Sequence, residues 1–314
     1  MIIYPEDSWS DEMIYVFLLM LVSLIIVFIY CWNFSSRICY MKTRSKSVCY
    51  KEEVEKGIIN PQIESEINHE DIVILSKFGY KIFGRFFPIE KSNKIVILCH
   101  GTNCTLFQSY KYRDLFLDLG YSVLMYDQRH HGDTGGRNIT YGYCEKHDLV
   151  SWIEWVKKTT NNSTLIGIHG ESMGAATAIL ALPLIWQDIK FCIADSVFSD
   201  LSQILLYRMK SKNKMYNRIL LTITDFIVRL RVGISFQKIS PVKSIASNYN
   251  VPVMIVHGLA DKIVPPQMGL DVYDNIPDTC KKYIFTVINA NHCEAIIKDR
   301  KGYMESLQKL LKSF

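Results

Sequence analysis

Residues 167–180 read GIHGESMGAATAIL, and the serine at their centre, Ser172, has a glycine two residues away on either side. An apolar run precedes this serine and small residues follow it, which predicts a strand, a sharp turn and a helix. In so tight a turn, a Cβ atom at Gly170 or Gly174 would collide with the neighbouring strand or helix. The helix dipole and the free N–H of Met173 would favour negative charge beside the serine. The stretch therefore predicts a nucleophile elbow, with the hydroxyl of Ser172 held out for reaction.

From about residue 71 onward, short apolar runs alternate with stretches of helical spacing. The first two runs, Asp71–Lys77 and Tyr80–Pro88, flank Phe78 and Gly79 and predict a hairpin. The later runs are almost continuously apolar, which is typical of strands covered on both faces. These runs are Lys94–Cys99, Tyr121–Tyr126, Thr164–His169, Phe191–Ala194, Val251–His257 and Lys282–Ile288. The helical stretches are Leu106–Leu119, Tyr143–Lys158, Met173–Trp186, Gln267–Ile276 and Ala295–Leu311. The pattern predicts an α/β fold with a mainly parallel sheet flanked by helices.

Polar residue types follow the ends of the predicted strands, where open parallel sheets bind their ligands. A serine hydroxyl needs a base to accept its proton, and the base needs an acid to orient it. His292 follows the last predicted strand and is the expected base, while Asp261 follows the strand before it and is the expected acid. Serine, aspartate and histidine occur in the chain order that accompanies this type of elbow. Asp195, directly after the strand Phe191–Ala194, is the alternative acid.

The negative charge that forms on a substrate carbonyl oxygen needs N–H donors. We expect one from Met173 and the other from Thr102, in the loop after the first buried parallel strand. His130, His131 and Asp133 lie close together in sequence, but three ligands without a further partner are weak support for a metal site. We interpret them as a turn, and the sequence predicts neither a metal nor a cofactor.

Five motifs occur in a characteristic order along the chain: LCHGTN, DQRHHGDTGG, GESMG, SPVKSIASNYNVPVMIVHGLADKIVP and NANHCE. With them, the chain from about residue 71 to its end resembles an α/β-hydrolase, in the branch of serine aminopeptidase-like and membrane-anchored esterase-like enzymes. One departure is His130, which stands where the family often has glycine. The resemblance implies a serine hydrolase that cleaves a carboxylic ester through an acyl-enzyme. The alternatives are a peptidase acting on small peptides or amides, and a non-catalytic binding or signalling module.

The chain begins with an apolar segment, since Met13 to Trp32 are twenty almost continuously apolar residues. At the rise of an α-helix this length spans a bilayer core, so residues 1–36 are predicted to hold a transmembrane anchor. A cleaved signal peptide is the alternative, but its basic flank and small-residue cleavage site are missing here. Five basic residues within 37–51 follow the segment and none precedes it, so we expect a single-pass protein with its catalytic domain in the cytoplasm.

Residues 37–70 are expected to form a juxtamembrane linker, and residues 71–314 the hydrolase domain with a helical cap inserted at about 198–248. Residues 201–250 carry nine basic residues and one acid, whereas the chain as a whole has a net charge of +5. Such local charge does not indicate a nucleic-acid partner. Two explanations remain for the basic residues of the cap. They keep an apolar lid soluble, or they contact anionic lipid.

Overall fold

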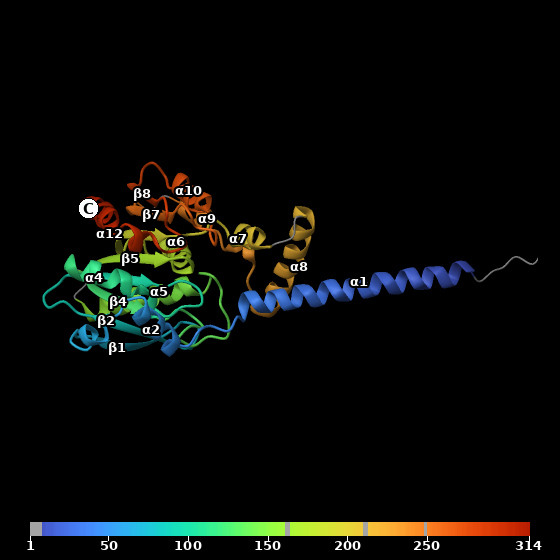
Figure 1. The fold of residues 1–314 in the computed structure, drawn as a ribbon, viewed down its shortest axis with the longest axis horizontal. Coiled ribbons are helices and arrows are strands. Elements are labelled where there is room, and N and C mark those ends of the chain that lie inside the picture. The colour runs from blue at the N-terminus through green and yellow to red at the C-terminus, as the bar shows by residue number, and fades with distance from the viewer. Residues whose placement is uncertain (1–7, 161–163, 210–212, 248–249) are drawn as a thin grey trace, which may run out of the picture.

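The computed structural model describes residues 8–160, 164–209, 213–247 and 250–314, and an eight-stranded sheet lies at its centre (Figure 1). The strands are β1 (Glu70–Leu75), β2 (Lys81–Phe87), β3 (Lys94–Cys99), β4 (Ser122–Tyr126), β5 (Leu165–Glu171), β6 (Ile189–Asp195), β7 (Val253–Gly258) and β8 (Lys282–Val287). Their order across the sheet is β1-β2-β4-β3-β5-β6-β7-β8. All strands from β4 to β8 in that order run parallel, and β2 is antiparallel to both of its neighbours. The predicted hairpin and the predicted mainly parallel sheet are confirmed.

Helices pack on both faces of the sheet, because the central strands are apolar on both sides. Alternate residues of β3 enter two separate cores: Ile95 and Ile97 belong to one, Val96 and Leu98 to the other. The first core includes α5 (Glu145–Thr159), α6 (Met173–Ile185), α9 (Pro241–Ile245) and α10 (Pro266–Asp274). The second includes α4 (Tyr110–Asp118), α11 (Ala295–Lys298) and α12 (Arg300–Leu311).

Two predicted helices are interrupted in the structure. The stretch expected as one helix from Leu106 begins as the 3-10 helix η1 (Leu106–Ser109) and continues as α4. The expected closing helix is split into α11 and α12 at Asp299, whose carboxylate accepts a hydrogen bond of 2.8 Å from the N–H of Gly302. That carboxylate caps a new helix start, a local interaction that the continuous amphipathic pattern does not reveal.

Residues 37–70 contain two helices, α2 (Lys46–Glu55) and α3 (Pro61–Glu64). They are attached to the sheet domain, since the side chain of Ile59 is buried in the core that also holds α4 and α12. The segment expected to be a linker is thus largely folded against the sheet domain.

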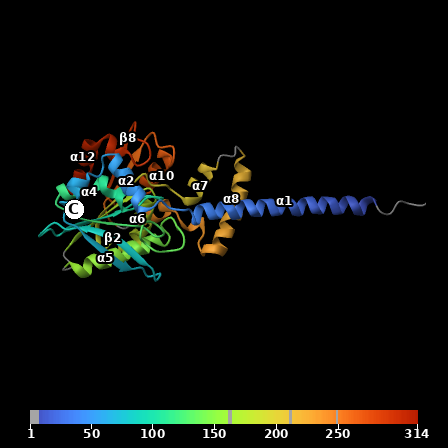
Figure 2. The ribbon, with the colours of Figure 1, turned by 60° about the horizontal axis from the view of Figure 1, so that its bottom comes forward.

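The helix α1 (Ser8–Cys39) extends away from the rest of the molecule (Figure 1). Within it, Asp11–Cys39 is long and apolar enough to cross a membrane, and its most apolar stretch is only 6% buried. The last part of α1 contacts α8 (Lys214–Val232), which follows α7 (Leu201–Arg208) in the insertion and precedes the 3-10 helix η2 (Phe236–Lys238). The described part of the insertion is therefore helical, as expected, and lies where α1 leaves the sheet domain (Figure 2).

Candidate active site

Ser172 stands in a strained turn between β5 and α6. Its φ of 55° and ψ of −114° lie outside the regions that residues with side chains ordinarily occupy. A Cβ atom at Gly170 would lie 2.2 Å from the carbonyl oxygen of Gly174, and one at Gly174 would lie 2.0 Å from the carbonyl oxygen of Cys99. Both contacts are far shorter than atoms tolerate, so the turn closes only because these two residues are glycines. A strained residue of this kind costs about 1–3 kcal/mol, and the surrounding packing holds it in place.

Three side chains expected to act together lie within hydrogen-bonding distance. The Oγ of Ser172 is 2.9 Å from Nε2 of His292, and Nδ1 of His292 is 2.6 Å from Oδ2 of Asp261. An ionised Asp261 accepts from Nδ1–H, which leaves Nε2 without a proton. In that tautomer Nε2 accepts the hydrogen bond of the serine hydroxyl and is placed to remove its proton.

Asp261 is held in its charged form. Burial alone would raise the pKa of this carboxyl, but hydrogen bonds from His257 and His292 outweigh burial and hold the pKa of Asp261 well below its usual range. Its second oxygen accepts from the N–H groups of Ile263 and Val264, at 2.8 and 2.9 Å. An acid fixed by so many donors can orient His292 without taking up a proton itself.

Asp195, the alternative acid, bonds to other partners. Its carboxylate accepts hydrogen bonds of 2.9 Å from the hydroxyls of Tyr112 and Ser196. Burial raises the pKa of Asp195 to about 6. The Oγ of Ser196 in turn accepts from the N–H of Cys293, the residue after His292. Asp195 is therefore linked to the histidine loop through Ser196.

Lys111 fixes the same loop from the other side. Its ammonium group lies 2.6 Å from Glu171 and donates a hydrogen bond of 2.8 Å to the carbonyl oxygen of Cys293. Both charged side chains are almost completely buried, at 7% and 2% exposed. Because a buried ion pair holds its partners in one geometry, the pair ties the His292 loop to the residue before Ser172.

The loop after β3 lies directly against the serine. A Cβ atom at Gly101 would lie 3.3 Å from the Cβ of Ser172, and the next residue, Thr102, lines the same cavity as Ser172 and Met173. As the first residue of α6, Met173 has an N–H group with no carbonyl partner within its helix. The two backbone segments expected to supply N–H donors therefore both border the serine.

Two neutral histidines brace this loop. Burial lowers the pKa of His100 to about 3 and that of His131 to about 4. His100 donates from Nδ1 to the carbonyl oxygen of Gly101 at 2.6 Å, while Nε2 of His131 accepts from the N–H of Asn103 at 3.0 Å. Since Nδ1 of His131 donates to Arg129, both of its ring nitrogens have partners within the protein. The 130–133 segment forms a turn, as interpreted from the sequence.

The sequence did not indicate that the chain just after α1 reaches this loop. The backbone N–H of Arg44 donates to the side-chain oxygen of Asn103 at 3.0 Å, and its Nε donates to the carbonyl oxygen of Asn103 at 2.8 Å. Lys46 also pairs with Asp133 at 2.6 Å. Arg44 and Lys46 belong to the cluster of basic residues after the apolar segment, which was interpreted from the sequence only as a sign of membrane orientation.

A cavity of about 270 Å³ opens beside the serine. It is lined by Met41, Thr102, Asn103, Tyr141, Ser172, Met173, Phe198, Leu201, Ile204, Leu205, Arg208, Ile263, Val264 and His292. Its walls come from the segment after α1, from α7 and from the loop after β7. The lining residues include apolar side chains, hydroxyls and one cation, Arg208, but no Asp or Glu among the residues that the structure describes.

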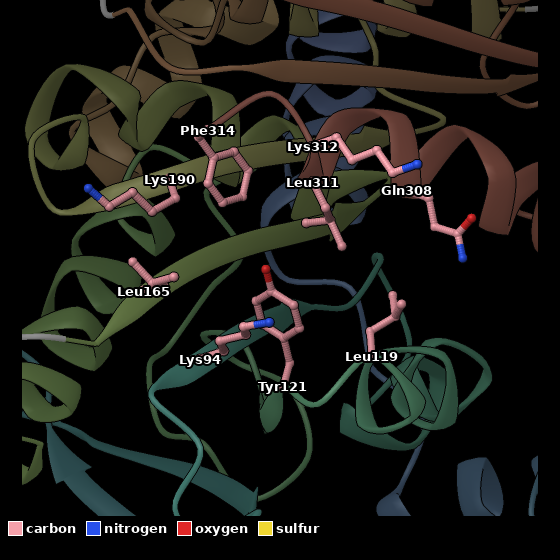
Figure 3. Close-up of a pocket in the computed structure, with 9 residues that line it drawn as sticks. All are labelled: Lys94, Leu119, Tyr121, Leu165, Lys190, Gln308, Leu311, Lys312 and Phe314. Atoms are coloured by element: carbon pink, nitrogen blue, oxygen red, sulfur yellow. The ribbon is translucent and has the colours of Figure 1, made fainter.

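A larger cavity, of about 710 Å³, lies at the opposite end of the strands (Figure 3). Lys94 and Leu165, the first residues of β3 and β5, line it together with Lys190 near the start of β6. Tyr121, Leu311 and Phe314 line the same cavity and lie beside these side chains in Figure 3. Ser172 and His292 line only the smaller of these two cavities, so we take the smaller one as the candidate site.

Known proteins resemble this chain in sequence and in fold. The family model described as X-Pro dipeptidyl-peptidase (S15 family) matches residues 41–221. The uncharacterized protein YqkD of Bacillus subtilis (strain 168) is 33% identical over 279 residues, covering 88% of this chain and 90% of that protein. The esterase Pf2001 of Pyrococcus furiosus gives a TM-score of 0.65 at 22% identity, covering 82% of this chain and 96% of its own. An α-β hydrolase of Vibrio vulnificus gives a TM-score of 0.61 at 14% identity, covering 82% of this chain and 86% of its own.

The geometry of the turn at Ser172 predicts that one methyl group added at Gly174 destabilises the fold. Gly174→Ala places a Cβ atom against the backbone of Cys99, which has no room to move within the sheet, so we expect the variant to lose the folded state or to melt far below the wild type. Ala178→Gly, four residues further along the same helix, is the matched control and should remain folded. Thermal melts of the two proteins give the comparison. A Gly174→Ala protein as stable as wild type would contradict the close approach of α6 to β3.

Proposed function

We propose a carboxylic ester as the substrate of this chain, which belongs to the S15 (X-Pro dipeptidyl-peptidase) family of the α/β-hydrolase superfamily and is a serine hydrolase. The nucleophile is Ser172, the base is His292 and the orienting acid is Asp261. The N–H groups of Met173 and Thr102 form the oxyanion hole. Hydrogen bonds of 2.9 and 2.6 Å along the series serine, histidine and aspartate support these roles.

The reaction begins when the Oγ of Ser172 attacks the acyl carbon while its proton passes to Nε2 of His292. The N–H groups of Met173 and Thr102 stabilise the negative oxygen of the tetrahedral intermediate. Collapse of that intermediate breaks the ester C–O bond, and His292 returns the proton to the departing alcohol. Water then attacks the acyl-enzyme with His292 again as base, and the carboxylic acid is released.

The lining of the cavity favours an apolar acyl group. Phe198, Ile204 and Leu205 provide apolar surface beside the serine, and no carboxylate occurs among its described lining residues. A peptidase that removes dipeptides must recognise a positively charged amino terminus, and a carboxylate is the natural partner for that charge. The family description nevertheless supports amide cleavage as a second candidate function. Esters and aminoacyl amides tested side by side on the full chain will separate the two.

We also propose that α1 is an uncleaved membrane anchor. Its length and composition support a span, and the five basic residues within 37–51 support a cytoplasmic catalytic domain. The basic residues of the cap are proposed to contact anionic lipid. Lys214 and Arg218 belong to α8, whereas Lys210 and Lys212 lie outside the described residues.

Ser172 is expected to react with a fluorophosphonate probe, with loss of fluoride, because the phosphoryl oxygen occupies the oxyanion position. Mass spectrometry of the labelled chain should find one modified residue, and Ser172→Ala should abolish labelling without changing the thermal melt. Short-chain p-nitrophenyl esters should be hydrolysed equally well with and without a chelator. A folded wild type that neither labels nor hydrolyses any ester or amide would favour the non-catalytic binding module.

Asp261→Asn is expected to lower kcat far more than Asp195→Asn does. Losing the charge at Asp261 removes the group that fixes the tautomer of His292, so kcat should fall on the order of 10³–10⁴-fold with folding intact. Asp195→Asn should cost much less, since Asp195 bonds to Ser196 and Tyr112 rather than to His292. Steady-state kinetics on one soluble ester gives both values. The reverse ranking would move the acid to Asp195.

The orientation of the anchor is tested by cysteine accessibility. A cysteine introduced at exposed Glu55 should stay unlabelled when an impermeant thiol reagent is added to intact cells, and should label after permeabilisation. The nine native cysteines are buried or partly buried and give a low background. Labelling of Glu55→Cys in intact cells would place the catalytic domain outside.

A further inference from the structure

The cap helix α8 carries an exposed apolar stripe. Met215, Ile219, Phe226 and Leu230 are 70%, 51%, 58% and 72% exposed. Their spacing of four, seven and four residues puts all of them on one side of an α-helix. Large apolar side chains exposed in a continuous stripe mark an interaction surface.

The other sides of α8 are already occupied. Leu221 and Val228 are buried in the core shared with the catalytic body, and helical periodicity places them opposite the stripe. A third side, with Leu220 and Ile227, packs against α1. The stripe therefore points away from the body, on the side from which the free part of α1 extends.

Contacts with α1 show at which point along α1 the helix α8 crosses it. The thiol of Cys31 donates to the carbonyl oxygen of Leu220 at 3.6 Å. The guanidinium of Arg231 lies over the ring of Trp32, at 4.1 Å from its centre, and also bonds to Ser36 at 2.9 Å. Trp32 is the last residue of the apolar segment, and tryptophan is favoured at the boundary between headgroups and hydrocarbon. The crossing thus lies at the end of the proposed membrane span.

The two helices also run in different directions. In both views α8 runs across α1 and not along it (Figures 1 and 2). A helix that crosses a membrane-spanning helix at the edge of its apolar segment lies roughly in the plane of the membrane surface.

We propose that α8 is an interfacial helix whose stripe, formed by Met215, Ile219, Phe226 and Leu230, inserts into the headgroup region of the bilayer. Amphipathic helices in this orientation bury their apolar face about 5–10 Å deep. Arg218 is exposed beside the stripe and is long enough to reach lipid phosphates, whereas Arg229, also beside the stripe, pairs with Asp225 at 3.6 Å. The proposal rests on the proposed membrane span of α1.

This placement brings the catalytic cavity close to the lipid. Leu201, Ile204 and Leu205 of α7 form one wall of the cavity, and Met41, two residues beyond the end of α1, forms another. Both walls are directly connected to the helices that contact the membrane. We therefore expect an ester held in the bilayer to be hydrolysed faster when the stripe is inserted than when it is not.

The test uses the full chain in lipid nanodiscs made of phosphatidylcholine and phosphatidylglycerol, with Cys144→Ser to remove the least buried native thiol. Phe226→Cys and Leu230→Cys are labelled with the fluorophore NBD, and Leu75→Cys serves as the control because Leu75 of β1 is 68% exposed. NBD on α8 should emit at shorter wavelength and be quenched by doxyl-labelled lipid, while NBD at the control position should behave as in water. Water-like emission at both α8 positions overturns the proposal. So does a shifted emission that doxyl lipid does not quench, which would indicate a second copy of the chain on the stripe.

A second measurement uses turnover. Phe226→Asp combined with Leu230→Asp should lower hydrolysis of a bilayer-embedded ester about tenfold or more, because charged side chains on the stripe oppose insertion. Turnover of a water-soluble ester should be unchanged, and Leu75→Asp should change neither rate. Equal loss on both substrates contradicts the proposal. If the wild type hydrolyses no ester, the proposed substrate fails while the fluorescence result still decides the position of α8, and carbonate extraction reports separately on α1.

Discussion

The contact between the start of α6 and the end of β3 is the constraint on which the whole site depends. The carbonyl oxygen of Cys99 occupies the space that a side chain at position 174 would need, and Gly170 faces Gly174 just as closely. This approach forces Ser172 into its unusual backbone conformation and brings it against Gly101. Every other feature of the site is arranged around a serine that the backbone has already fixed.

The ionisable groups around this serine differ in their charge state. The acid that faces His292 accepts several hydrogen bonds and stays ionised, whereas the histidines beneath the loop after β3 are buried and stay neutral. The charged groups near the serine include the carboxylate of Asp261, which contacts His292, together with Arg208 at the cavity wall and the buried pair of Lys111 and Glu171. The histidines of the site therefore differ in role because they differ in burial.

Much of the fold could be predicted from the sequence because apolar runs report directly on burial. The strands of the sheet were recognisable, and the residues at their ends converge in space because parallel strands end at one edge. The sequence favoured Asp261 over Asp195 as the acid, but both residues follow strands, and their positions relative to His292 distinguish them. The contact of Arg44 with Asn103 could not be predicted from the basic cluster in which Arg44 lies, because polar contacts between distant segments leave no periodic pattern. The break at Asp299 was hidden for a similar reason, as a cap needs only one local hydrogen bond.

The attachment of Arg44 to Asn103 also bears on how the protein divides into separable parts. A membrane enzyme is usually made soluble by removing its anchor together with the chain that links it to the catalytic domain. Here a cut after residue 44 would remove Met41 from the cavity wall and leave Asn103 without the two hydrogen bonds that Arg44 donates. The boundary of the sheet domain therefore lies inside the segment that charge and composition mark as a connector, and a complete cavity wall requires the chain from Met41 onward.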